Sequence, residues 1–323
     1  MPDNNTIQDL IIIGAGAAGL SAGIYAGRYR MKAVIISETI GGETALAGKI
    51  ENYPGVKPLD GFDLMQIMQE QAAALGVKTG LARVEKIARS EHCFTVTTTQ
   101  GEYFTHGIIF ALGAERRRLG LPNEKELTGR GVHYCITCDG PLYRGKTIAL
   151  VGGGDASIKG LNLAAEYVNK IFLIVRGKEI TAEPINLEQM KKLGDKVEVL
   201  FETEVKAIVG QDKVEKIVLS RPYNGFNELA IDGLFVEVGA IPNTELAKSL
   251  GAKLDAAGYI EADAMMKTNI DGVFAAGDTV NLFGRFKQDI TAAAMGAVAA
   301  TSAYEDRNIH GEVCLWHAKA TIS

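Results

Sequence analysis

The sequence predicts an α/β protein that contains two parallel, doubly wound sheets. The segment "DLIIIGAGAAGL" is an apolar run that leads into a glycine turn and a helix pattern, and "TIALVGGGDASIKG" repeats this order about 140 residues later. A second apolar run follows each of them, "AVIIS" in the first case and "KIFLIV" in the second. Strand, glycine turn, helix and strand in this order form a βαβ unit, so the chain is expected to hold two such folds.

The other elements follow from local patterns of apolar and β-branched residues. We expect strands at residues 10–13, 33–37, 147–151 and 170–175, and helices from about residue 17 to 30 and from residue 155. The run "HCFTVTTTQGEYFTHGIIFALGA" alternates and predicts a hairpin followed by a return strand, and "VEVLFETEVKAIVGQDKVEKIVLS" repeats that pattern later. The small residues of "DITAAAMGAVAATSAY" predict a closely packed helix near the end of the chain.

The composition limits the classes of function. The 323 residues carry a net charge of −5 and are 47% hydrophobic, which is typical of a globular protein and gives no general affinity for nucleic acid. No apolar run reaches the ~18 residues that span a bilayer, and the start "MPDNNTIQDL" lacks the layout of a signal peptide. We therefore expect a cytoplasmic protein with no membrane span and no nucleic-acid partner.

The first glycine turn has the residue pattern of a dinucleotide site. Gly14 permits the tight turn, Gly16 lets a pyrophosphate approach the backbone, and Gly19 lets helix and strand pack closely. The helix N-terminus adds free N–H groups and a positive dipole end. The candidate binding residues are Gly14, Gly16, Ala17, Ala18, Gly19 and, at the end of the second strand, Glu38 for a ribose hydroxyl. A glycine turn that only packs is the other interpretation.

Cys135 and Cys138 form a CxxC pair in "YCITCD". Such a pair is typical either of half a zinc site or of a redox dithiol. A zinc site needs a second pair, and only His133 lies nearby in the sequence, so the redox interpretation is favoured and no metal is expected. Asp139 directly follows the pair, where it could protonate a leaving thiolate or serve only as a turn or cap residue.

Four segments resemble the low-molecular-weight thioredoxin reductases, which are flavoprotein disulphide oxidoreductases. These are "VHYCITCDGPLYRGKTIALVGGGDAS", "GGETALAGKIENYPG", "GAIPNT" and "FAAGD", and the resemblance covers nearly all of the chain. It implies an FAD-binding domain of residues 1–116 and 246–323, with a central pyridine-nucleotide-type domain of residues 117–245 inserted in it. It also implies a homodimeric enzyme in which electrons pass between FAD and the disulfide and on to thioredoxin or a thioredoxin-like protein.

The same resemblance implies roles for single residues. Cys138 would be the sulfur that faces the flavin, Cys135 would attack the disulfide of the partner protein, and Asp139 would be the acid. Gly277 and Asp278 would hold the flavin ribitol, and the helix that begins near Asp289 would point its N-terminus at the flavin. The residues implied to bind FAD, besides the first glycine turn, are Gly42, Glu43, Asn52, Gly277, Asp278, Lys287, Gln288, Asp289 and Ile290.

The electron donor is the point at which the sequence departs from the family. NADPH-dependent members carry a His-Arg-Arg run and a further Arg after the second glycine turn, where this chain reads "IVRGKEITAEP". Each guanidinium contact to the 2′-phosphate is worth about 1.5–3 kcal/mol, so NADPH binding is expected to be weak. The candidates for a second nucleotide are Gly152, Gly154, Asp155, Ser157, Arg176 and Lys178. Ferredoxin is an alternative donor.

The C-terminal segment and the direction of electron flow leave alternatives open. Trp316 or His317 could cap the flavin, or the segment could be a loosely packed tail. An enzyme of the same fold that oxidises dithiols and passes the electrons to flavin is a second functional hypothesis, and some relatives of that kind hold a second flavin. A flavin-binding protein without turnover is a third, which the Cys135, Cys138 and Asp139 set argues against.

Overall fold

The computed structural model describes residues 7–47, 49–90, 93–284 and 286–310. The chain divides into two compact units, Met1–Glu115 with Pro242–Ser323, and Arg116–Ile241. The resemblance puts the corresponding boundaries after residues 116 and 245, and the nucleotide that it assigns to each unit stays a prediction. In the part of the chain described, no helix is long and apolar enough to cross a membrane.

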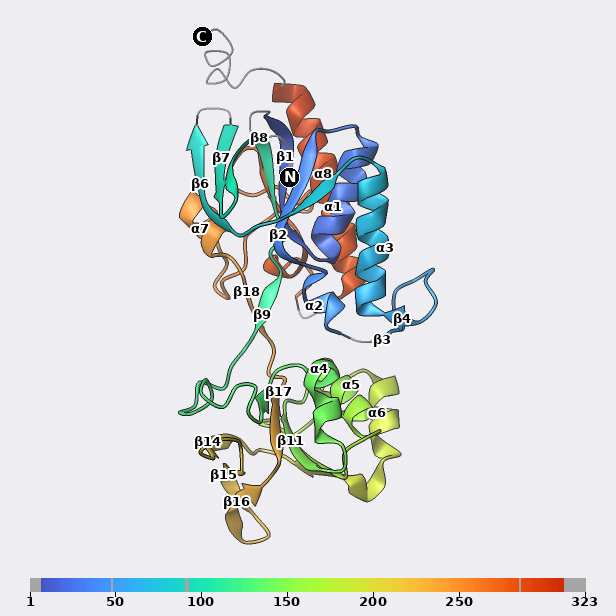
Figure 1. The fold of residues 1–323 in the computed structure, drawn as a ribbon, viewed down its shortest axis with the longest axis vertical. Helices are drawn as coiled ribbons and strands as arrows, with labels where there is room; N and C mark the ends of the chain where they lie inside the picture. Colours follow the sequence, from blue (N-terminus) through green and yellow to red (C-terminus); the bar gives the residue numbers. More distant parts are fainter. Residues whose placement is uncertain (1–6, 48, 91–92, 285, 311–323) are drawn as a thin grey trace. The chain divides into compact units, whose positions relative to one another are not determined.

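The first unit is built on a seven-stranded sheet (Figure 1). The strand order is β5-β2-β1-β8-β7-β6, and β19 also pairs with β8. Pairing is parallel from β5 to β8 and for β19, whereas β6, β7 and β8 pair antiparallel. The strands are β1 Gln8–Ala15, β2 Ala33–Ile40, β5 Lys78–Leu81, β6 Val84–Ser90, β7 Cys93–Thr98, β8 Gly101–Phe110 and β19 Val273–Ala275. The predicted hairpin is β7–β8, and β8 is also the return strand, since it continues into the parallel part of the sheet.

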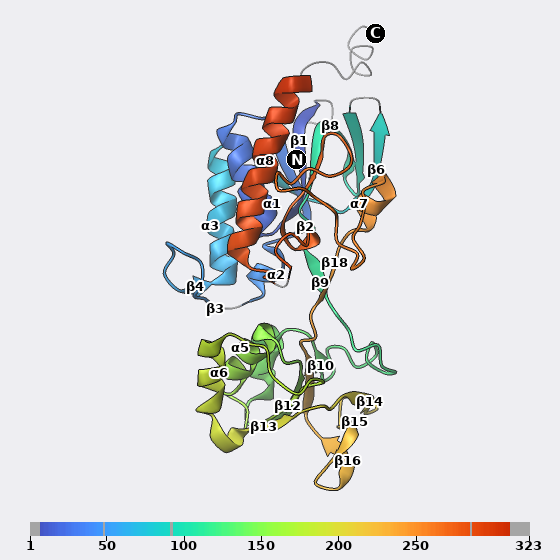
Figure 2. The same cartoon turned by 180° about the vertical axis from the view of Figure 1, so that it is seen from behind.

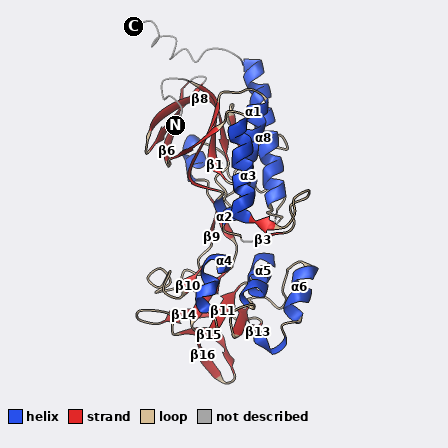
Figure 3. Cartoon of the chain, turned by 45° about the vertical axis from the view of Figure 1, so that its right-hand side comes forward, coloured by secondary structure: helices blue, strands red, loops and turns tan. Residues whose placement is uncertain are grey.

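Helices cover one face of this sheet (Figures 2 and 3). These are α1 (Ala17–Arg28), α3 (Gly61–Ala74) and α8 (Asp289–His310), and they share one apolar cluster with the sheet. The small residues of α8 allow a close approach to α1, because a Cβ at Gly296 would lie 2.0 Å from the carbonyl oxygen of Ala18. The shorter elements of this unit are α2 Gly42–Ala45, β3 Lys49–Ile50, β4 Leu59–Asp60, α7 Glu245–Leu250 and the 3₁₀ turn η3 Gly277–Thr279.

The second unit contains a five-stranded parallel sheet of order β10-β17-β11-β12-β13. Its strands are β10 Val132–His133, β11 Thr147–Val151, β12 Lys170–Ile174, β13 Val197–Leu200 and β17 Gly233–Val236. A three-stranded antiparallel sheet shares an apolar cluster with one face, and consists of β14 Val205–Val209, β15 Lys216–Tyr223 and β16 Phe226–Ala230.

The helices of the second unit pack through a different apolar cluster on the opposite face (Figure 3). They are α4 Ile136–Asp139, α5 Asp155–Ala164 and α6 Pro184–Lys191, with the 3₁₀ turns η1 Gly140–Tyr143 and η2 Gly194–Lys196. The short strands β9 Ala114–Arg116 and β18 Ala240–Pro242 pair where the chain passes between the units. Each unit thus has a sheet with a parallel strand–glycine turn–helix–strand unit, β1-α1-β2 in the first and β11-α5-β12 in the second, which confirms the predicted α/β fold class.

Candidate functional site

The first glycine turn joins β1 to α1 and leaves the start of α1 accessible. Gly14 has φ +111°, and a Cβ there would lie 2.1 Å from the carbonyl oxygen of Ala111. A Cβ at Gly19 would lie 1.9 Å from the carbonyl oxygen of Gly14. Both positions therefore need glycine for the backbone to pack in this way. Gly16 is different, because the nearest heavy atom to its Cβ position is 3.9 Å away. Gly16 also precedes α1 without any side-chain cap, so the N–H groups of the first turn face a space that an anion could fill.

The other residues predicted for this site lie at the start of α1, beside it, or on the adjacent strand β2. Ala17 and Ala18 form the buried start of α1, and Gly277 (φ +79°) packs so closely that a Cβ added there would lie 2.8 Å from the Ala18 Cβ. Glu38 is exposed and lies inside β2, which continues to Ile40 rather than ending at Glu38. The turn, the start of α1 and Gly277 thus form one small-residue cradle with an acid on the adjacent strand.

Two segments far apart in the sequence meet at the start of α8. Thr44 donates a hydrogen bond to Asp289 over 2.5 Å, and the Asn52 amide donates to the Gln288 side chain over 2.8 Å. The predicted residues Gly42, Glu43 and Asn52 therefore lie in the same region as Gln288, Asp289 and Ile290. Thr44 was not predicted, although it directly follows Glu43 in the sequence.

Asp278 and Lys287 are a half-buried pair of opposite charge. Burial raises the pKa of Asp278, the charge of Lys287 lowers it, and the charges of Asp289 and Glu43 raise it. Burial also lowers the pKa of Lys287, whose ammonium donates to the carbonyl of Val280 and lies 4.4 Å from the ring centroid of Tyr259. Within the described part of the chain, no group donates a hydrogen bond to the Asp278 carboxylate. A ligand with hydroxyl groups would supply the missing donors, so these residues fit a dinucleotide with a sugar-like chain.

Cys135 and Cys138 are joined in a disulfide with a Cα–Cα distance of 5.4 Å. Cys135 precedes α4 and its Sγ accepts a hydrogen bond from the Cys138 N–H over 3.1 Å. Cys135 is half-buried and Cys138 is exposed. Metal ligation requires thiolates, which a disulfide does not offer, so this form is that of a redox pair rather than of a zinc site.

A buried histidine connects Asp139 to Tyr143. The Nδ1 atom of His133 lies 2.9 Å from the Asp139 carboxylate, and its Nε2 atom lies 2.8 Å from the Tyr143 hydroxyl. The imidazole is 4% exposed and stacks on Phe235 at a centroid distance of 5.2 Å. Burial raises the pKa of Tyr143, and the charges of Asp139 and Asp232 raise it further. The sequence pointed to His133 only as a neighbour of the thiols, and Tyr143 was missed.

The second glycine turn joins β11 to α5, and most of its candidate residues have partners within the fold. Gly152 has φ +146°, and a Cβ there would lie 2.2 Å from the Ser157 hydroxyl. That hydroxyl donates to the carbonyl oxygen of Glu237 over 2.9 Å. The Asp155 carboxylate accepts from the Glu183 N–H and from the Asn186 amide, over 2.9 and 2.8 Å. Gly154, by contrast, has no heavy atom within 4 Å of its Cβ position.

The cations beyond this turn are few. Arg176 and Lys178 are exposed. The pKa of Glu204 is lowered chiefly by the hydrogen bond and charge of Lys206, and in smaller part by the charge of Arg176, so Arg176 lies within electrostatic reach of an acid. Trp316 and His317, the predicted flavin cap, lie outside the described residues.

Comparison with known proteins assigns the family. A family model described as "Pyridine nucleotide-disulphide oxidoreductase" matches residues 8–299. The thioredoxin reductase of Treponema pallidum is 38% identical over 92% of this chain and 96% of its own length. The chain belongs to the low-molecular-weight thioredoxin reductase family.

Solved structures of this reductase family agree. The Lactococcus lactis thioredoxin reductase "FR conformation" is 33% identical, has a TM-score of 0.87, and the match covers 93% of this chain and 98% of that one. A "Ferredoxin-Flavin Thioredoxin Reductase" from Clostridium acetobutylicum is 30% identical, with a TM-score of 0.50, and the match covers 94% of this chain and 98% of that one. The chain is thus a thioredoxin reductase-like oxidoreductase, which confirms the predicted enzyme class.

Proposed function

We propose that this reductase-like chain binds FAD and passes electrons between FAD and the Cys135–Cys138 disulfide, and on to thioredoxin or a similar protein. One observation carries the proposal: the CxxC pair is a disulfide, and Asp139, which follows it, lies within hydrogen-bond distance of the buried His133 ring. Its relative from Treponema pallidum bears the name thioredoxin reductase. Formation of a homodimer stays a prediction.

The binding of FAD is supported by three features of the first unit. The N–H groups at the start of α1, beside Gly16, suit the pyrophosphate, and Glu38 on the adjacent strand suits a ribose hydroxyl. The half-buried Asp278 carboxylate would accept from the ribitol hydroxyls. The start of α8, with Gln288 and Asn52 bonded to each other, would line the flavin edge. When bound, FAD supplies a two-electron carrier.

The residues of the second unit would perform the disulfide chemistry. Two electrons that enter the S–S bond break it and leave two sulfurs, of which Cys138 is the exposed one. Cys135, as a thiolate, would then attack a disulfide of the partner protein by thiol–disulfide exchange. Asp139 would hold the proton that one of the sulfurs needs when it leaves.

We also propose that a reduced low-potential carrier such as ferredoxin, rather than NADPH, is the main electron donor. Only Arg176 and Lys178 are cationic in the loop after β12, and Arg176 lies within reach of Glu204. Gly177 and Thr181 stand where NADPH-dependent members carry guanidinium groups. A relative with the printed name ferredoxin-flavin thioredoxin reductase shares the fold at 30% identity.

An anaerobic titration tests both proposals. NADPH, NADH, reduced ferredoxin and reduced thioredoxin are added separately to the purified protein, and the absorbance band of oxidised flavin is followed. Bleaching by ferredoxin and not by either nucleotide is expected; rapid bleaching by NADPH would overturn the proposed donor. Bleaching by reduced thioredoxin alone would favour a dithiol-oxidising enzyme. The Cys138→Ser variant should keep bound FAD but lose thioredoxin reduction, and unchanged reduction would refute the role of the thiol pair.

A further inference from the structure

Asp139, His133 and Tyr143 form a hydrogen-bonded chain, and its acid directly follows Cys138 in the sequence. His133 is buried between the rings of Tyr143 and Phe235, and each of its nitrogens has a single polar neighbour. A neutral imidazole has one donor and one acceptor nitrogen, and a tyrosine hydroxyl can both donate and accept. The charged imidazole and the neutral tautomer with its proton on Nδ1 therefore both donate to the Asp139 carboxylate without any movement of side chains. The other neutral tautomer, with its proton on Nε2, finds a partner at Nδ1 when Asp139 carries a proton.

This arrangement gives the Asp139 carboxylate a partner that can take up or release a proton, which a carboxylate bonded only to solvent lacks. A carboxylate bonded to an imidazole forms a unit in which one proton can lie on either group. Asp139 directly follows Cys138 in the sequence, so the unit belongs to the same turn of chain as the thiol pair.

We propose that His133 is a positioning residue that holds the Asp139 carboxylate in place and carries the proton that Asp139 exchanges with a cysteine sulfur. The proposal rests on the proposed function. In reduction, two electrons from reduced flavin enter the S–S bond, the bond breaks, one sulfur takes the proton from the Asp139–His133 pair, and the other remains a thiolate. In the reverse step the S–S bond forms, its two electrons would pass to oxidised flavin, and the proton returns to the pair.

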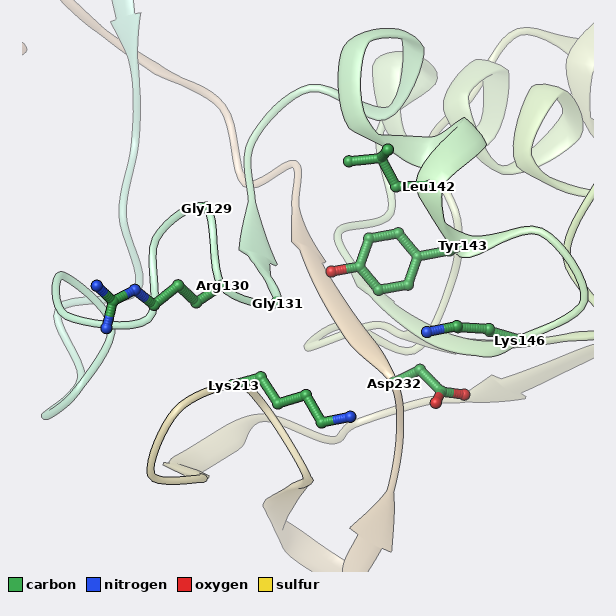
Figure 4. Close-up of a pocket in the computed structure, with 8 residues that line it drawn as sticks. All are labelled: Gly129, Arg130, Gly131, Leu142, Tyr143, Lys146, Lys213 and Asp232. Carbon is green, nitrogen blue, oxygen red and sulfur yellow. The ribbon is translucent and has the colours of Figure 1, made fainter.

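Tyr143 gives this unit a connection to solvent. Its ring forms part of the wall of a pocket of about 230 Å³, together with Gly131, Lys146, Lys213 and Asp232 (Figure 4). Figure 4 shows the Lys213 and Lys146 side chains pointing toward the space beside Asp232. The charged groups near the chain include Asp139 and Asp232, with Arg130, Lys213 and Lys146 on the pocket wall, and the Lys146 ammonium is 5.9 Å from the Tyr143 ring centroid.

The test uses His133→Asn, which keeps an amide donor for Asp139 but cannot carry a proton, in the flavin-loaded protein. Two rates are measured from about pH 6 to pH 9: disulfide reduction in a single turnover, and iodoacetamide alkylation of the dithiol form, followed by mass spectrometry. We expect each rate to fall about ten- to a hundredfold near neutral pH. For disulfide reduction, the difference in rate between wild type and variant should become smaller in acid, where solvent supplies protons. For alkylation, the difference should become smaller in alkali, where solvent accepts protons. An equal loss at every pH would mean a purely structural role and would overturn the proposal.

Two further variants keep the test decisive. In an Asp139→Asn background, adding His133→Asn should change neither profile, whereas an additive loss would contradict action through Asp139. If His133→Asn does not fold, Tyr143→Phe keeps the ring packing, removes the Nε2 partner and should show the same pH-dependent loss to a smaller degree. Alkylation does not depend on turnover. A wild-type protein that reduces no protein disulfide would therefore refute the proposed function, while a His133-dependent alkylation profile would still support this inference.

Discussion

Under the proposed donor, an arginine at Gly177 should raise the affinity of the loop after β12 for NADPH. Gly177 is exposed, its φ lies outside the positive region, and a Cβ there would meet only the backbone of Glu179, at 3.7 Å or more. The substitution therefore adds a guanidinium without strain or clash. A guanidinium pairs with a phosphate through two parallel hydrogen bonds, and a charged hydrogen bond is worth about 1.5–3 kcal/mol. We expect Gly177→Arg to lower the dissociation constant for NADPH by about 10- to 150-fold.

The assay is anaerobic stopped-flow reduction of the flavin at increasing nucleotide concentrations. NADH lacks the 2′-phosphate, so its dissociation constant should not change, and the ratio of the two nucleotides isolates the new contact. Gly177→Gln is the matched control, because it adds a side chain of similar reach without charge, and it should leave both nucleotides unchanged. Equal gains for NADPH and NADH, or no gain for either, would show that no 2′-phosphate approaches this loop, and the reasoning from the missing arginines would fail.

Three other substitutions test the site and the packing around it. Burial raises the pKa of Asp278, so the stability that this group contributes is present below the ordinary value of 3.8 and is lost as the pH rises through the higher folded value. Asp278→Asn should therefore stabilise the flavin-free protein at neutral pH but not in acid, and weaken FAD binding about tenfold or more, as thermal unfolding and flavin titration would show. Glu124 accepts three backbone N–H groups and a tyrosine hydroxyl, so Glu124→Gln should lower the free energy of unfolding in urea by about 2–4 kcal/mol, and exposed Glu126→Gln should not. Gly14→Ala should abolish FAD retention because its Cβ would meet a carbonyl oxygen at 2.1 Å, whereas Gly55→Ala, with φ +83° but no atom within 4 Å, should cost only about 1–2 kcal/mol of stability and retain FAD.

Much of the fold follows from local patterns. The first strand, the helix after it, and their counterparts β11 and α5 lie where the apolar runs and glycine turns predict them. Pairing partners are less local, which is why the two roles of β8 could not be predicted: its alternating pattern fixes which residues face the core but not which strands lie beside it. The extension of β2 to Ile40 was also not predicted, because the polar residues after Ser37 give no pattern of a strand.

The candidate site divides in a similar way. Glycines and cysteines are visible in the sequence because their chemistry is tied to the residue type, whereas His133 and Tyr143 acquire a role only through contact. His133 ends β10, Asp139 ends α4 and Tyr143 ends η1, so three different elements bring them together. Because they belong to three different elements, no single helix or strand period relates them, and no sequence motif records their contact.

The second glycine turn shows why a motif can persist without its ligand. Gly152 cannot carry a side chain because Ser157 and the Glu237 carbonyl fill that space, and Ser157 is bonded to the same carbonyl. These residues hold α5 against β17 whether or not a nucleotide binds, so their presence is weak evidence for a second nucleotide. The informative positions are those that the packing of the fold does not require, such as Gly154 and the exposed Arg176 and Lys178. Residue types at these positions depend on a nucleotide more than on the fold. The loop after β12 has two cations, Arg176 and Lys178, where NADPH-dependent members carry several guanidinium groups. The proposed donor therefore rests on the loop after β12 and not on the glycine turn.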